Sequence, residues 1–207
     1  MANATAKYVS LKPPPDADDQ VRSGNDWTLD LQELEAAITP RTKAIYFNNP
    51  HNPLGKVFTR DELLGIGNLC IKHNLLLISD EVYERIAFES PPHCKTAGPH
   101  IPMASLSPEI SARTLTAISL GKLFNASGWR VGFIVGPKQL VAPVEATHII
   151  LAYSSSAPAQ QACVKGLKLA DEKDWWSENV RDLARRCQFV CDALDEIGLV
   201  ISSPKLR

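Results

Sequence analysis

Apolar residues recur along this chain with two different spacings. Short apolar runs alternate with longer stretches in which apolar residues return every three or four positions. Uninterrupted short runs are typical of strands that are covered on both faces, as in a parallel sheet. Strands are predicted at residues 43–47, 75–79, 114–118 and 131–135.

Helix signals separate these runs. Asp30 begins a capping pattern for a short helix, and Thr59 with Glu62 forms a capping box for a longer one that ends at His73. Strands that alternate with helices predict an α/β fold with a mostly parallel sheet flanked by helices. Further elements are predicted as helices at residues 138–153 (disturbed at Pro143), 158–171 and 175–197, and as a final strand at 199–202.

Charge and cysteine content narrow the kinds of partner and compartment. The 207 residues carry 22 basic and 23 acidic side chains, so no overall field attracts nucleic acid or a membrane, and small molecules or other copies of this chain are the expected partners. The five cysteines form no CxxC pair, and the first residues lack the features of a secretory leader. A cytoplasmic location is predicted, or a mitochondrial one if the true N-terminus lies upstream.

Polar residues follow three of the predicted strands. Asn52 follows the first, Asp80 and Tyr83 follow the second, and a larger group follows the third: Ser119, Lys122 and Arg130. In open α/β sheets, ligands bind outside the carboxyl ends of the strands, so these side chains are expected to converge.

Together, these residue types suit pyridoxal phosphate. A lysine forms a Schiff base with the aldehyde of this cofactor, a carboxylate keeps the pyridine nitrogen protonated, and an arginine with a hydroxyl binds the phosphate. Hydrogen bonds from Asn52 and Tyr83 to the phenolic oxygen of the ring would keep the lysine linkage reactive near neutral pH.

Each candidate also has an ordinary structural interpretation. A lone lysine is most often a solvated surface residue, and Asp80 with Glu81 could end a strand without any ligand. Tyr83 could be an interface aromatic, and Asn52 a turn residue before proline. Other signals are interpreted as structural only, with no metal site predicted: the cysteine pair Cys187 and Cys191 as core residues, and Arg181, Arg185 and Arg186 as a solvated helix face.

Three segments carry a family resemblance: NNPHNPLGKVF, ISDEVYE and SLGKLFNASGWRVGF. In this order they are similar to the signatures of the class I/II aminotransferases of PLP fold type I, and the similarity runs from about residue 8 to about residue 203. The surrounding sequence most resembles the kynurenine aminotransferase and cysteine-conjugate β-lyase branch. The resemblance implies catalytic roles for Lys122, Asp80 and Tyr83, with Lys122 as the Schiff-base lysine. It implies that Asn52 and Tyr83 contact the phenolic oxygen, and that Ser119 and Arg130 bind the phosphate.

The resemblance also implies a reaction and a domain arrangement. An amino group would pass from an amino acid, kynurenine or a relative being the first expectation, to a 2-oxo acid, with β-elimination from cysteine conjugates as the alternative. Residues 1–153 would be part of the cofactor-binding large domain, and residues 154–207 the connecting helices and the start of the small domain. A homodimer, or association with a full-length relative, is expected.

Family members are longer at both ends. Upstream they carry further phosphate-binding groups and an aromatic side chain stacked on the cofactor, and downstream an arginine that pairs with the substrate carboxylate. This sequence has no counterpart of these groups, so weak turnover is expected. A truncated, non-catalytic homologue that acts by association is the alternative.

Overall fold

The structure is a computed structural model that describes residues 4–13, 24–88 and 99–198. Its strands are β1 (Ala44–Asn48), β2 (Leu76–Asp80), β3 (Thr114–Ser119) and β4 (Gly132–Val135). Its α-helices are α1 (Leu31–Ala37), α2 (Arg60–Lys72), α3 (Pro108–Ser111), α4 (Leu120–Leu123), α5 (Lys138–Leu151), α6 (Ala157–Glu172) and α7 (Trp175–Glu196). Single 3-10 turns lie at Gly24–Asp26, Met103–Ser105 and Ser127–Trp129.

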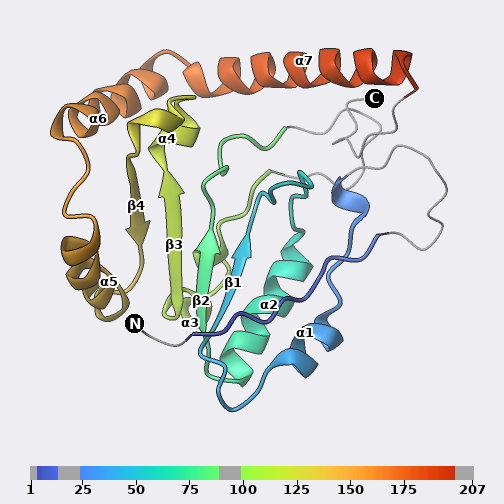
Figure 1. The fold of residues 1–207 in the computed structure, drawn as a ribbon, viewed down its shortest axis with the longest axis vertical. Coiled ribbons are helices and arrows are strands. Elements are labelled where there is room, and N and C mark those ends of the chain that lie inside the picture. Colours follow the sequence, from blue (N-terminus) through green and yellow to red (C-terminus); the bar gives the residue numbers. More distant parts are fainter. Residues whose placement is uncertain (1–3, 14–23, 89–98, 199–207) are drawn as a thin grey trace.

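The sheet has the order β1-β2-β3-β4, with the first three strands parallel and β4 antiparallel to β3. The register pairs Asn48 with Asp80 and Asp80 with Ala117, so the ends of the parallel strands meet at one edge. Figure 1 shows the three parallel arrows ending on the side of the sheet along which α7 runs. The predicted α/β fold with a mostly parallel, helix-flanked sheet is confirmed.

Side chains alternate between the two faces of the sheet. On one face, Leu77 and Ser79 are fully buried, and Phe47 of β1 packs against the same core. The register puts Tyr46 and Asp80 together on the opposite face, where Tyr46 is 63% exposed. We call this second face, which carries Tyr46, Asn48 and Asp80, the open face.

Helix α2 packs on the buried face, and local sequence specifies its start. The Glu62 backbone N–H donates to the Thr59 hydroxyl, and the Thr59 N–H donates to Glu62 Oε2, which completes the predicted capping box. The other carboxylate oxygen of Glu62 pairs with the buried Lys56 ammonium at 2.9 Å. This pair ties the preceding loop, which carries Asn52, to the helix.

The part of the molecule that comprises β4 and α4–α7 is packed more sparsely than the part around α2. A small second cluster consists of Leu120, Leu123, Val131 and Cys163. The ring of Phe124 lies 5.3 Å from that of Trp175 and 5.4 Å from that of Trp176, so this tryptophan pair packs against the residue that ends α4. All residues of β4 are exposed, and α5 has no buried residue.

The predicted element boundaries differ from the observed ones by no more than two residues. Helix α5 runs through Pro143, because the Gln139 carbonyl that loses its donor lies on an exposed helix, where water can satisfy it. The turns α3 and α4 are too short to show a helical period and were not predicted. The predicted strand at 199–202 lies outside the described residues. None of the described helices combines the length and apolar character that a bilayer crossing needs.

Candidate active site

Asn52 and Tyr83 meet beyond the ends of β1 and β2. The Asn52 side-chain amide donates to the Tyr83 hydroxyl oxygen at 3.3 Å, although the residues are 31 positions apart. The loop that carries Asn52 is held by a 2.7 Å hydrogen bond from the Asn52 backbone N–H to Asn48 Oδ1. Two peptide bonds of this loop, Asn49–Pro50 and Asn52–Pro53, are cis. The strand-end rule therefore brings these two predicted residues together.

Asp80 ends β2, and two donors hold its carboxylate. The Tyr46 hydroxyl donates to Oδ2 at 2.6 Å, and the Val82 N–H donates to Oδ1 at 3.3 Å. The Asp80 carbonyl accepts hydrogen bonds from the Asn48 side chain at 2.9 Å and from the Asn49 backbone at 3.0 Å. The backbone and the side chain of Asp80 are thus both fixed at the edge of the sheet.

Tyr46 is a neutral donor to this carboxylate at physiological pH. Burial of its hydroxyl and, next, the hydrogen bond to Asp80 raise the pKa of Tyr46 to about 12. Ionisation would remove the shared proton and place a second negative charge beside Asp80. Sequence reasoning did not identify Tyr46, although the alternation of apolar Ile45 and Phe47 with polar Tyr46 and Asn48 places it on the face of Asp80.

Ser119 ends β3, and Lys122 lies in the helical turn α4 that follows directly. The Ser119 hydroxyl caps α4 by accepting the Lys122 backbone N–H at 3.3 Å. A hydroxyl accepts and donates at once, so the Ser119 proton can still serve a ligand. The Lys122 ammonium nitrogen lies 6.0 Å from the centre of the Tyr83 ring. The third strand end therefore delivers its lysine beside the Asn52–Tyr83 pair.

Arg130 lies further along the chain than Ser119 and Lys122, directly after a short 3-10 turn. It follows the Ser127–Trp129 turn in the left-handed region, with φ 55° and ψ 40°, and its guanidinium donates to the Ser127 carbonyl at 3.1 Å. Ser155 donates to the Arg130 carbonyl at 3.3 Å. Within the described part of the chain, no hydrogen bond joins Arg130 to Ser119 or Lys122.

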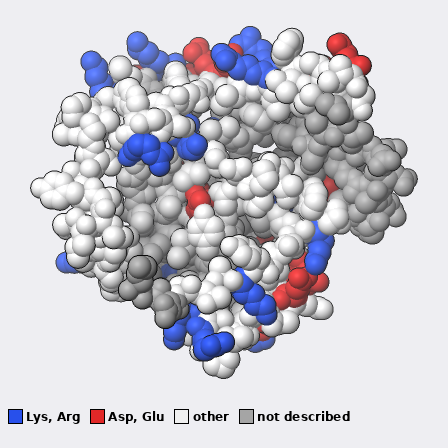
Figure 2. All heavy atoms as spheres, viewed as in Figure 1, with Lys and Arg blue, Asp and Glu red and all other residues white. Residues whose placement is uncertain are grey.

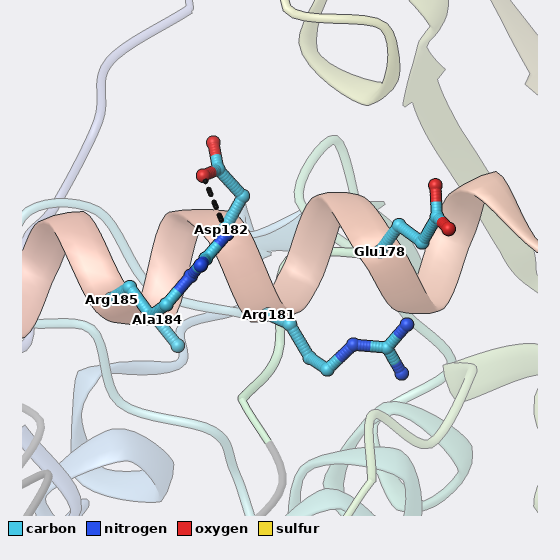
Figure 3. A pocket seen from close by; sticks show the side chains of 5 residues that line it. All are labelled: Glu178, Arg181, Asp182, Ala184 and Arg185. Atoms are coloured by element: carbon cyan, nitrogen blue, oxygen red, sulfur yellow. Dashed lines mark hydrogen bonds and ion pairs between the residues drawn. The ribbon is translucent and has the colours of Figure 1, made fainter.

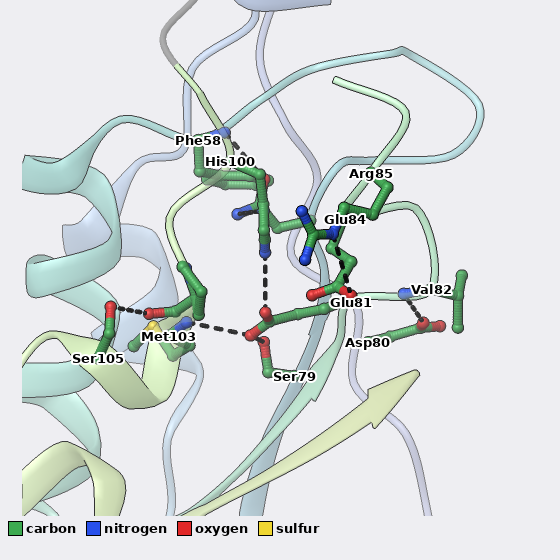
Figure 4. A network of polar contacts seen from close by, with 12 residues as sticks. Phe58, Ser79, Asp80, Glu81, Val82, Glu84, Arg85, His100, Met103 and Ser105 are labelled. Carbon is green, nitrogen blue, oxygen red and sulfur yellow. Dashed lines mark hydrogen bonds and ion pairs between the residues drawn. The ribbon is translucent and has the colours of Figure 1, made fainter. Parts of the chain in front are cut away.

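A buried network lies behind Asp80, and sequence reasoning missed it. Glu81 is 1% exposed and accepts from the Ser79 hydroxyl at 2.7 Å and from the Met103 backbone N–H at 3.0 Å. Its second oxygen lies 2.8 Å from His100 Nε2 (Figure 4). The signal in the sequence was the period of two that puts Leu77, Ser79 and Glu81 on the same buried face.

The same network reaches the loop that carries Asn52. His100 Nδ1 lies 3.4 Å from the Asn49 amide nitrogen, and Asn49 Oδ1 accepts the Phe58 backbone N–H at 3.1 Å. Because the Asn49 N–H also donates to the Asp80 carbonyl, the loop and the strand end share one support.

Glu84 adds a third ionisable group beside Glu81 and His100, and the ligand atoms of the three lie within 4.8 Å of one another. Burial raises the pKa of Glu84, and Arg85 opposes this shift. Glu81 already accepts three hydrogen bonds, so these contacts account for the cluster without a metal ion.

The donor set at the strand ends fits pyridoxal phosphate. A primary amine, a carboxylate and an amide–phenol pair are gathered at one edge of the sheet, with Ser119 in the same turn as Lys122. In the view of Figure 2, most of the charged side chains lie toward the rim of the molecule, and few lie near the centre. The chemistry of these groups matches the aldehyde, the ring nitrogen, the phenolic oxygen and the phosphate.

A separate hollow of about 660 Å³ lies along α7 and contains none of these residues. It is lined by Glu178, Arg181, Asp182, Ala184 and Arg185 (Figure 3). Asp182 pairs with Arg185 at 3.2 Å and with Arg186 at 2.7 Å. These ion pairs fit the interpretation of the basic residues as a solvated helix face.

Comparisons with known proteins identify similar sequences and structures. The sequence matches the family model for aminotransferase class I and II over residues 5–205. It is 37% identical over 199 residues to the "Probable kynurenine--oxoglutarate transaminase BNA3" of Saccharomyces cerevisiae, which covers 96% of this chain and 43% of that protein. The crystal structure of Bna3p matches with a TM-score of 0.84 and 38% identity, over 93% of this chain and 44% of that one.

Two further matches widen the comparison. The "Probable N-succinyldiaminopimelate aminotransferase DapC" of Mycobacterium tuberculosis is 37% identical over 202 residues, which are 97% of this chain and 46% of that protein. A PLP-bound structure from Clostridium difficile matches with a TM-score of 0.69 and 27% identity, over 82% of this chain and 42% of that one. The chain spans less than half the length of these relatives.

Proposed function

Because this chain belongs to the class I and II aminotransferase family, we propose that it transfers an amino group from a kynurenine-like amino acid to a 2-oxo acid, with pyridoxal phosphate as cofactor. The observation that carries the proposal is the position of the Lys122 amine beside the Asn52–Tyr83 pair, at the sheet edge where Asp80 ends β2. The names of the yeast and mycobacterial relatives support the substrate class, an amino acid paired with a 2-oxo acid.

Each residue has a defined task in this proposal. When bound, pyridoxal phosphate supplies an electron sink for the charge that develops on the substrate α-carbon. Lys122 Nζ would hold the cofactor covalently and, once freed, would take and return the α-carbon proton as general base and acid. The Asp80 carboxylate would accept the N–H of the ring nitrogen and keep it protonated.

The remaining residues would bind and orient. Asn52 and Tyr83 would direct their donors to the phenolic oxygen, while the Ser119 hydroxyl and the Arg130 guanidinium would bind the phosphate. Arg130 has five N–H donors, so phosphate binding does not require it to give up the Ser127 carbonyl.

The first experiment tests the cofactor. Purified protein with added pyridoxal phosphate should show the visible absorption of a lysine-bound cofactor, and Lys122→Ala should abolish it. Lys138→Ala is the matched control, because Lys138 is an exposed lysine at the start of α5. Borohydride reduction and peptide mapping should place the label on Lys122. A label on any other lysine would overturn the assignment.

The second experiment tests the reaction. Kynurenine with 2-oxoglutarate should yield glutamate, with N-succinyldiaminopimelate as a second donor and pyruvate release from a cysteine conjugate as the readout for β-elimination. Asp80→Asn should still capture pyridoxal phosphate that is added in excess, although with lower affinity, and should lower turnover by orders of magnitude, because an unprotonated ring stabilises the carbanion poorly. A lysine-bound cofactor with no product from either donor would contradict amino transfer and favour the non-catalytic alternative.

Association with a second chain is part of the proposal. Large apolar side chains of α5 are exposed, with Ile150 at 84% and Leu151 at 80%. Exposed apolar patches of this kind are typical of protein–protein contacts. Sedimentation of the 207-residue chain, alone and with a longer relative, should show a dimer or a mixed complex; a monomer in both would contradict this part of the proposal.

A further inference from the structure

Tyr46 stands out on the open face of the sheet. Its β1 neighbours Ile45 and Phe47 pack against the α2 core, whereas Tyr46 is 63% exposed. Its hydroxyl nevertheless makes a 2.6 Å hydrogen bond to Asp80 Oδ2, across 34 positions of sequence. The parallel register, which pairs Tyr46 with Ile78 and Asn48 with Asp80, sets this diagonal contact between adjacent strands. An exposed tyrosine is thus directed at the carboxylate of the candidate active site.

The hydrogen bond from Tyr46 restrains the orientation of the Asp80 carboxylate. The torsion that rotates a carboxylate about its last carbon–carbon bond is broad, so the acid needs donors to fix its plane. The bond from the Val82 N–H to Oδ1 is long, at 3.3 Å, which makes the 2.6 Å bond from Tyr46 the stronger restraint. Each carboxylate oxygen has two acceptor positions, so Asp80 keeps capacity for a further donor.

We propose that Tyr46 is a positioning residue for the cofactor: its hydroxyl orients the Asp80 carboxylate and stabilises its charge, so that Asp80 accepts the N–H of the pyridine ring. This inference rests on the proposed function. A donor to an ionised carboxylate favours the ionised form, and this keeps the shared proton on the ring nitrogen instead of on Asp80. The effect of Tyr46 on cofactor binding therefore depends on the ring nitrogen. A purely structural contact between the strands would have the same effect whether or not the ligand carries that nitrogen.

The hydrogen bond can be tested on the protein without cofactor. The chain has four tyrosines, and loss of one ring-carbon NMR signal in Tyr46→Phe assigns Tyr46. In the wild type this signal should titrate near its raised pKa of about 12, and in Asp80→Asn the pKa should fall, since the carboxylate contribution is lost while burial remains. An unchanged pKa in Asp80→Asn would contradict the contact. The raised pKa also predicts that the stability contributed by this bond is full below pH 10 and is lost as pH rises through about 12.

The positioning role is tested by the choice of ligand. Wild type, Tyr46→Phe and the control Tyr8→Phe, which removes a hydroxyl from a tyrosine that is 90% exposed, are titrated with pyridoxal phosphate and with its deaza analogue, in which carbon replaces the ring nitrogen. Tyr46→Phe should weaken binding of pyridoxal phosphate roughly tenfold and leave binding of the analogue unchanged. Tyr8→Phe should change neither.

Two outcomes would overturn the proposal. Equal weakening for both ligands would show that Tyr46 supports only the scaffold, and unchanged binding of pyridoxal phosphate would show that Asp80 needs no orientation. If the wild-type chain captures no pyridoxal phosphate, the proposed function and this cofactor role are both wrong, while the titration without cofactor still decides whether the Tyr46–Asp80 bond exists.

Discussion

The two halves of the molecule differ in how firmly they hold their share of the site. In the first half, which comprises β1–β3 with α1–α3, nine of the described residues are buried together in one core. In the second half, which comprises β4 with α4–α7, the corresponding cluster has four buried residues among those that the structure describes, and β4 is exposed throughout. Asn52, Asp80 and Tyr83 belong to the first half. Lys122 and Arg130 belong to the second, so the cofactor would join a rigid set of groups to a less firmly supported one.

Charged groups show the same contrast. Glu81 in the first half is buried and accepts from three donors, while Asp182 on α7 pairs with two arginines that are 79% and 75% exposed. Removing one member of a buried polar network leaves the others unsatisfied, whereas water replaces an exposed partner. Similar residue types therefore have different energetic weight in the two halves.

The largest expected difference concerns apolar packing. Leu63→Ala removes a side chain that is 0% exposed from the first core, and should destabilise the protein by about 2–5 kcal/mol. Leu167→Ala on α6, where the side chain is 37% exposed, should cost less than about 1 kcal/mol. Urea unfolding of the 207-residue chain measures both. Equal losses would show that the second half is packed as tightly as the first.

A smaller difference in stability is expected when two glutamates, one from each half, are replaced by glutamine: Glu81 and Glu178. Glu81→Gln replaces one of the two acceptor oxygens by an NH2 group, which then faces a hydrogen-bond donor. The substitution should destabilise the protein by about 1–3 kcal/mol. Glu178→Gln, on the exposed face of α7, should change stability by no more than about 0.5 kcal/mol. Urea unfolding curves at neutral pH measure both stability changes. A Glu81→Gln variant as stable as the wild type would mean that the buried network does not support the strand end.

The sequence predicted what depends on local pattern. The capping box of Thr59 and Glu62 predicted the start of α2, and the apolar run before Asp80 predicted β2, because capping and periodicity act within a few residues. The strand-end rule then placed Asn52 beside Tyr83 and brought Lys122 near the Tyr83 ring.

What the sequence could not predict depends on register between distant segments. The Tyr46–Asp80 bond requires the specific pairing of β1 with β2, and the Glu81–His100 pair joins residues 19 positions apart through a connection with no periodic signal. Arg130 is a different case, because its guanidinium bond to Ser127 is set by a left-handed turn that its spacing from Lys122 does not reveal.

The smallest expected difference in stability concerns the residues that precede the first turns of α2 and α6. Thr59 caps α2 with its hydroxyl, and the Glu62 that completes the capping box also pairs with Lys56. Ser156 precedes α6 and makes no capping hydrogen bond with its side chain. Thr59→Ala should therefore cost about 1 kcal/mol, while Ser156→Ala should leave stability unchanged, because only the first removes a partner from a helix N–H. Thr59→Ser is the matched control, since it keeps the hydroxyl and should retain most of the stability. The shift in urea midpoint at constant slope measures all three variants, and a Ser156→Ala loss as large as that of Thr59→Ala would show that α6 is capped in solution and that the two halves are alike in this respect.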